Sequence, residues 1–241
     1  MEYSQDQIDR LIIGIYKGLV DVTKLPVKLY KACFDYLFSG VDLGAKDSLD
    51  KVMMTALRND VHLFSAAKTF NYVLETKGLI LENGKILPLV EFKKRAKSVF
   101  GLYYDAWLET EYATALNQSA SIRNWQEVLD SPLELVQYET VGDRHVSDIC
   151  RQYDGLIYPK NHPIWQKISP LNHYRCRCLL KTVDSGRISS KDYTDFKNEV
   201  ASGFDRNAYY DKKIYPSNHP YYDVPKKYSK LAKRNFYLPK D

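Results

Sequence analysis

The sequence lacks several features by which large classes of protein are recognised. No segment approaches the roughly 18 uninterrupted apolar residues of a membrane-spanning helix, so we expect no membrane partner. The first ten residues, MEYSQDQIDR, show no basic start followed by an apolar core, so no signal peptide is expected. Only four cysteines occur in 241 residues. Without an export signal, these predict thiols in a reducing compartment rather than a disulfide framework.

Motifs that mark common enzymes and DNA-binding proteins are also missing. There is no glycine-rich phosphate loop and no helix motif with paired carboxylates. A helix-turn-helix or zinc finger is not recognisable, which argues against a free DNA-binding protein. His145 and His162 could serve as acid and base in a nuclease, but isolated histidines are more often surface or core residues. The sequence therefore predicts a protein that is not an enzyme.

Positive charge is concentrated at the C-terminal end. The chain carries a net charge of +5, and its last sixteen residues hold six Lys or Arg and one Asp, leaving 29 basic and 29 acidic side chains in residues 1–225. Such a tail could contact phosphates or an acidic protein groove, or it could be a solvated terminal arm. The candidate contact residues are Lys226, Lys227, Lys230, Lys233 and Arg234.

The first half of the chain has the apolar spacing of α-helices. The pattern recurs in residues 5–19, 25–40, 59–78 and 89–129, and Asn83-Gly84 predicts a turn of the kind that closes a small hairpin. In the last of these helices one stripe is expected to face inward. It consists of Phe92, Ala96, Val99, Tyr103, Trp107 and Ala113, with Gly101 as a possible bend.

After Pro132 the pattern changes to short strands and turns. Residues 133–142 and 156–159 are rich in β-branched and aromatic side chains, which predicts strands. Between them we expect a short helix capped by Asp143 that turns Cys150 inward. A polar helix is predicted around residues 189–200.

These patterns together predict an α+β protein. It has a mainly helical domain (1–131), a small α+β motif domain (132–183) and an irregular C-terminal extension with the basic tail (184–241).

Cysteine and histidine gather in the segment HPIWQKISPLNHYRCRC, residues 162–178. His173, Cys176 and Cys178, with Cys150 upstream, supply four ligands of the types that zinc prefers. The Cys-x-Cys spacing is tighter than in most zinc motifs, so the sequence alone favours a buried thiol cluster without metal. In that arrangement Arg177 would bond backbone carbonyls or Asp154. A thiolate–imidazole pair for catalysis is the third alternative, but no local signature of a cysteine protease accompanies it.

Two stretches, TVGDRHVSDICRQYDG and HPIWQKISPLNHYRCRC, resemble the signature of phage Mu F-like minor head proteins, also called phage head morphogenesis proteins. The residues that match the family pattern are Thr140, Asp143, Asp154, Gly155, Trp165, Pro170, Cys176, Arg177 and Cys178. The chain departs from the pattern in carrying Cys150 where histidine is usual. Because histidine and thiolate are both good zinc ligands, this exchange is compatible with a metal-binding position.

The resemblance implies a structural protein of the virion. It implies a minor capsid component that acts in head morphogenesis near the portal, with portal and other capsid proteins as partners and packaged DNA as a possible contact of the basic tail. We expect the apolar face around Trp107 and Tyr112 to dock on the portal or capsid interior. The competing interpretation is a toxin or effector enzyme built on a Mu F-like domain. Only 63 residues follow Cys178, fewer than most catalytic domains need.

Overall fold

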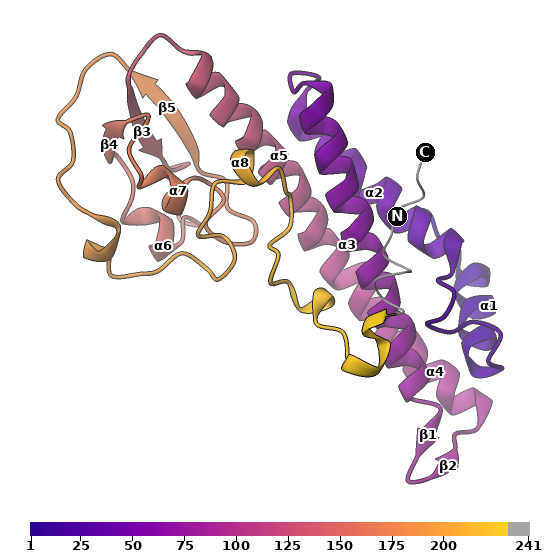
Figure 1. The fold of residues 1–241 in the computed structure, drawn as a ribbon. Helices are drawn as coiled ribbons and strands as arrows, with labels where there is room; N and C mark the ends of the chain where they lie inside the picture. Colours follow the sequence, from indigo (N-terminus) through magenta and orange to yellow (C-terminus); the bar gives the residue numbers. More distant parts are fainter. Residues whose placement is uncertain (231–241) are drawn as a thin grey trace. The chain divides into compact units, whose positions relative to one another are not determined.

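The structure, a computed structural model, describes residues 1–230 (Figure 1). Its contacts divide the chain into two compact units, each made of segments that are not continuous in sequence. Unit 1 comprises residues 1–38, 58–112 and the segment from 218 onward; unit 2 comprises 39–57 and 113–217. The expected α+β class with a helical first half is confirmed. The three-domain division predicted from the sequence remains a prediction.

Unit 1 is built from helices. It contains α1 (Gln5–Tyr16), the first part of α2 (Val27–Ala45), most of α3 (Lys51–Gly78), α4 (Leu89–Gly101) and the start of α5 (Leu108–Asp130). The turn expected at Asn83-Gly84 joins strands β1 (Leu81–Glu82) and β2 (Lys85–Ile86) in a small hairpin. Two 3₁₀ turns follow near its C-terminal end, Pro220–Tyr222 and Lys226–Tyr228.

A π-helical turn, Leu102–Trp107, joins α4 to α5. A π turn adds one residue to the helical repeat, so the buried stripe moves by one position along the sequence. The predicted stripe is right at Phe92, Ala96 and Tyr103, which are buried, and wrong at Trp107, at the end of the π turn. Leu108 is buried, whereas Trp107 is 40% exposed. The ring of Tyr112, on the face expected to be uncovered, packs 4.7 Å from that of Tyr36.

Unit 2 contains a three-stranded antiparallel sheet in the order β4-β3-β5. The strands are β3 (Leu135–Glu139), β4 (Ile157–Pro159) and β5 (Leu179–Val183). Both strands expected after Pro132 are thus present. In β3 alternate side chains, Val136 and Tyr138, are buried, as expected for a strand with one face against a core. This core also contains Trp125 from α5 and Trp165, whose rings lie 6.4 Å apart.

The outer edge of β5 is covered by a side chain of α5. Asn124 accepts a hydrogen bond from the Leu180 amide at 2.8 Å and donates one to the Leu180 carbonyl at 2.9 Å. The carboxamide thereby satisfies the same two backbone groups that a further strand would satisfy. This pair of bonds attaches the sheet to α5 beside the cysteine-rich loop.

Short elements complete unit 2: α6 (Asp148–Arg151), α7 (Trp165–Ile168), α8 (Ala208–Asp211) and a 3₁₀ turn at Tyr193–Asp195. The polar helix predicted around 189–200 is wrong, since only that 3₁₀ turn forms there. The segment instead bonds to the rest of the unit. Ser189 exchanges two hydrogen bonds with the backbone of Ile157, and the Asn198 amide donates to Gln152. These tertiary bonds replace a helix that had no apolar stripe of its own.

Candidate metal centre

Cys150 is placed by the short helix α6. Its side chain is 1% exposed, so the expected inward orientation is confirmed. The cap of the helix is Ser147, whose hydroxyl accepts a hydrogen bond from the Cys150 amide at 3.2 Å, and not Asp143 as predicted. The turn that begins at Asp143 ends at Val146, before the helix starts. Asp143 is therefore one turn too early to cap it.

His173 and Cys176 come from the loop between α7 and β5. Its backbone is fixed by side chains of α5: Asn117 donates to the Cys176 carbonyl at 3.2 Å, and Ser121 donates to the Pro170 carbonyl. The fully buried Asn172 donates to the Tyr138 hydroxyl at 2.9 Å. The loop is thus attached both to α5 and to the central strand of the sheet.

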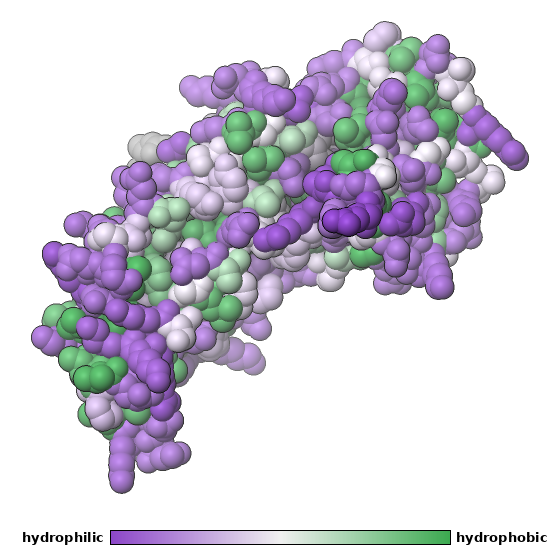
Figure 2. All heavy atoms as spheres, turned by 180° about the vertical axis from the view of Figure 1, so that it is seen from behind, coloured by the Kyte–Doolittle hydropathy of each residue, from purple (hydrophilic) through white to green (hydrophobic). Residues whose placement is uncertain are grey.

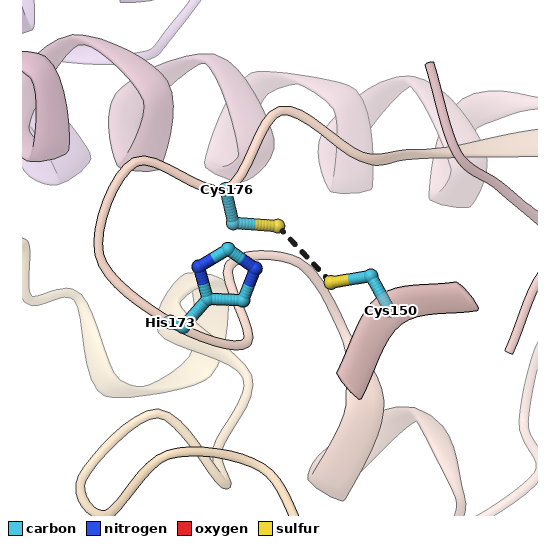
Figure 3. Close-up of side chains that lie close together, drawn as sticks. All are labelled: Cys150, His173 and Cys176. Carbon is cyan, nitrogen blue, oxygen red and sulfur yellow. Dashed lines mark hydrogen bonds between the residues drawn. The ribbon is translucent and has the colours of Figure 1, made fainter. Parts of the chain in front are cut away.

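These elements bring three ligand-type side chains together. One ligand atom each from Cys150, His173 and Cys176 lies within 4.8 Å of the others, and the two sulfur atoms are 3.7 Å apart. Figure 3 shows the imidazole ring beside the two thiols, with Cys150 approaching from α6 and the other two residues from the loop. Three of the four candidate ligands named from the sequence therefore lie together, and Cys178 lies outside this set of three.

The imidazole of His173 is oriented by polar contacts at both of its ring nitrogens. Nδ1 lies 2.7 Å from the Tyr174 carbonyl, which can only accept, so Nδ1 carries a proton in this arrangement. Nε2 lies 2.8 Å from the Ser147 hydroxyl, on the side of α6. A metal-binding histidine commonly donates its second ring N–H to a carbonyl in this way. In the neutral imidazole, the contact with Tyr174 therefore leaves Nε2 with a lone pair for a ligand or for Ser147.

Cys178 adjoins this group without belonging to the set within 4.8 Å. Hydrogen bonds from Cys176 and then Cys178 lower the pKa of the Cys150 thiol. The same contacts with Cys150 raise the pKa of Cys176 to about 11 and raise that of Cys178 further. A hydrogen bond with Cys150 also raises the pKa of His173. Within the cluster the pKa of Cys150 is therefore lowered, and the pKa values of the two neighbouring thiols are raised.

The outer side of the cluster faces a surface pocket. It is lined by α5 and by the Cys-Arg-Cys segment, including Arg123, Arg177 and the half-buried Cys178. Cys150 does not line this pocket.

The matched polar residues of the family signature form two pairs. Arg177 binds Asp143 through two hydrogen bonds of 2.9 and 3.0 Å, which lower the pKa of the Asp143 carboxyl. Asp154 instead accepts from the amide and hydroxyl of Thr140, at 2.8 and 2.9 Å. The predicted pairing of Arg177 with Asp154 is therefore wrong.

The other matched residues shape the backbone. Gly155 has a φ of +74°, which favours glycine, and its amide donates to the Tyr138 carbonyl at 2.9 Å. Trp165 is fully buried, and its indole N–H donates to the Pro159 carbonyl at 3.0 Å. Pro170 lies at the start of the loop, with its carbonyl bound by Ser121.

The remaining candidates lie apart from the cluster. His145 is exposed beside Arg144, and His162 packs on Tyr158 with 4.6 Å between ring centroids. In the basic segment Lys226, Lys227 and Lys230 are exposed, whereas Lys233 and Arg234 fall outside the described residues.

Sequence reasoning missed Ser147 and Asn172. The Ser-x-x-Cys spacing around α6 is a helix-cap pattern that could have identified the first. A buried asparagine inside the loop gave no comparable pattern.

Comparison with known proteins links this region to a phage family. Residues 90–181 match the family model described as Phage Mu protein F like protein, which supports the resemblance. The matched region runs from α4 to β5 and includes the whole cluster. No curated protein and no solved structure gave a match. At the level of the family, the match supports a phage head morphogenesis protein.

Proposed function

We propose that this chain is a minor head protein of a phage, which joins the assembling head near the portal and remains in the virion. The observation that carries the proposal is the family match over residues 90–181. None of the helices within residues 1–230 is both long enough and apolar enough to cross a membrane. The partners expected from the family are other proteins of the capsid.

Contact with packaged DNA is the second part of the proposal. Lys226, Lys227 and Lys230 are exposed, and none of them makes an ion pair with another described residue. Exposed lysines neutralise phosphates and release counterions, so such binding weakens steeply with salt. Replacing the three lysines by glutamine should reduce DNA retention by purified chain at low salt and leave folding unchanged.

The thiol cluster is proposed to be structural rather than catalytic. A nucleophilic cysteine must be reached by its substrate, whereas Cys150 and Cys176 are 1% and 2% exposed. Cys176→Ala should consequently alter stability or assembly, and it should not change the rate of any reaction. Protease, nuclease or ADP-ribosyltransferase activity that disappears in this variant while its stability is unchanged would favour the effector enzyme instead.

We further propose that the cluster binds zinc. Two thiols and an imidazole lie close enough to share an ion, and the adjoining Cys178 is the natural fourth ligand. Three thiolates and one imidazole are a common donor set for structural zinc. The bond from His173 to the Tyr174 carbonyl supplies the outer contact that orients such a ligand. Bound zinc would hold α6 and the cysteine-rich loop together.

Mass spectrometry of purified particles tests the main proposal. The chain should be present in procapsids and in DNA-filled heads, in far fewer copies than the major capsid protein. Procapsids assembled without the chain should be formed less often or with the wrong shape. Absence from both kinds of particle, together with secretion or killing of neighbouring cells, would exclude the minor head protein and favour the effector.

A further inference from the structure

The hairpin end of unit 1 exposes large aliphatic side chains. Leu81 and Ile86 are 61% and 68% exposed and are paired directly across the hairpin, so they lie on the same face. Val90, in the first turn of α4, is 83% exposed. Figure 2 shows hydrophobic side chains gathered at this end of the unit among hydrophilic ones. The hairpin and the first turn of α4 are called the apolar tip below.

The loop after α1 lies beside the apolar tip and extends it. Tyr16 donates to the Leu87 carbonyl at 2.7 Å, and Asp21 pairs with Lys77 at 3.8 Å. Between these two contacts the loop carries Leu19, which is 79% exposed. A cluster of this kind, raised on a hairpin that contributes nothing to the core, is characteristic of a binding surface.

The surface around the apolar tip carries an excess of positive charge that is not paired within the described residues. The carboxylates nearest to it are already paired within unit 1: Glu82 and Glu91 bind Arg95, and Asp21 binds Lys77. Four exposed lysines of the same region have no ion pair with any residue that the structure describes. They are Lys17, Lys24, Lys85 and Lys94.

We propose that the apolar tip docks onto another protein of the phage head, at a surface strip of aliphatic side chains bordered by carboxylates. The inference rests on the proposed function and names the chemistry of the partner. Aliphatic side chains would be buried against the strip, and the unpaired lysines would face its acidic border. A second copy of the chain fits poorly, because two such tips would bring like charges together. Proteins that insert into membranes usually add Trp or Tyr, and residues 79–91 contain neither.

Photo-crosslinking in cells that assemble heads tests the partner directly. A photoreactive amino acid in place of Ile86 should crosslink to a segment of another head protein that has more Asp and Glu than Lys and Arg. Leu81→Ser in the same chain should lower the crosslink yield about tenfold, as expected for the loss of roughly 1.4 kcal/mol of binding. Val52 is equally exposed, at 66%, but lies outside the apolar tip, so a probe there should give no such product.

A binding assay with purified full-length chain separates this inference from the proposed function. A helical peptide with one leucine face flanked by glutamates should bind, and the same peptide with lysines in place of the glutamates should not. Lys85→Glu should weaken binding, and Val52→Ser should leave it unchanged.

The inference is overturned by crosslinks to a second copy or to phospholipid. It is also overturned by binding to phosphatidylserine vesicles but not to the acidic peptide, or by equal binding of both peptides. If the acidic peptide binds but the chain is absent from heads, the proposed function fails while the chemistry of the tip stands.

Discussion

A buried ion pair in unit 1 gives the sharpest test of how this structure is stabilised. Lys68 of α3 is fully buried, and its ammonium lies 2.8 Å from Glu111 of α5. The hydroxyl of Tyr221 joins them, accepting from Lys68 at 3.2 Å and donating to Glu111 at 2.9 Å. Burial raises the pKa of Glu111, although the charge of Lys68 opposes this shift. The ionised form of Glu111 is therefore stabilised by the charge of Lys68.

The variant Lys68→Met removes that partner and leaves Glu111 to be protonated. Taking an ordinary glutamate pKa of about 4.3, neutralising it at pH 7 costs about 3.7 kcal/mol, and at pH 5 about 1 kcal/mol. The pKa of Glu111 in the folded variant lies above its unfolded value, so stability is retained at low pH and lost as pH rises. We expect the variant to be destabilised by about 3–4 kcal/mol at pH 7, in line with other broken buried pairs, and by much less at pH 5.

A double variant decides whether the charge itself is responsible. Lys68→Met with Glu111→Leu removes both charges and leaves the Tyr221 hydroxyl without these two partners, at a cost of about 1–2 kcal/mol. Hydrogen exchange of peptides from residues 58–78 of α3 during urea unfolding reports unit 1 specifically. Lys77→Met, in the exposed pair with Asp21, is the control and should cost under about 1 kcal/mol. The reasoning fails if the double variant is destabilised by the sum of the two single changes, or if the Lys68→Met effect does not depend on pH.

Three further predictions concern other parts of the chain. Wild-type chain purified with zinc should contain about one zinc ion, and this ion should be lost in Cys150→Ser but kept in Cys33→Ala. Removing the zinc with a chelator should increase hydrogen exchange in residues 138–183 only. Wild-type chain that contains no zinc would refute the proposed metal site. Gly44→Ala should destabilise unit 2 by roughly 2 kcal/mol or more, because an added Cβ would clash with the Leu116 carbonyl. An unchanged unfolding midpoint would contradict this. Burial and Lys68 lower the pKa of His219 to about 4, so stability should fall by about 1–2 kcal/mol between pH 6.5 and pH 5, and His219→Gln should remove this fall.

The elements of the fold were predictable where a local pattern determines them. Helical spacing identified the long helices, and Asn83-Gly84 identified the hairpin turn. The π turn at 102–107 was not predictable, since its extra residue leaves no mark in apolar spacing and displaces Trp107 from the core. The segment 189–200 was wrongly predicted as a helix. Its hydrogen bonds to β4 and to Gln152 determine its conformation, and these bonds cannot be inferred from neighbouring residues.

The residues of the cysteine and histidine cluster could be predicted from the sequence, whereas the residues that surround the cluster could not. Residue type and spacing were sufficient to bring Cys150, His173 and Cys176 together. The buried pair of Lys68 and Glu111 was missed, although a lysine in line with Phe64 and Tyr72 on an apolar helix face was a visible signal. A long-range pair is hard to predict because its second member lies 43 residues away.

The polar residues of the family signature share one physical role in this structure. Asp154 binds the amide and hydroxyl of Thr140, and Asp143 binds Arg177, so each carboxylate joins two segments of unit 2 that are distant in sequence. Neither carboxylate belongs to the cluster around Cys150. A catalytic signature would bring its acids and bases to a common accessible point. These residues instead join chain segments on either side of Cys150 and Cys176, as the structural role proposed above requires.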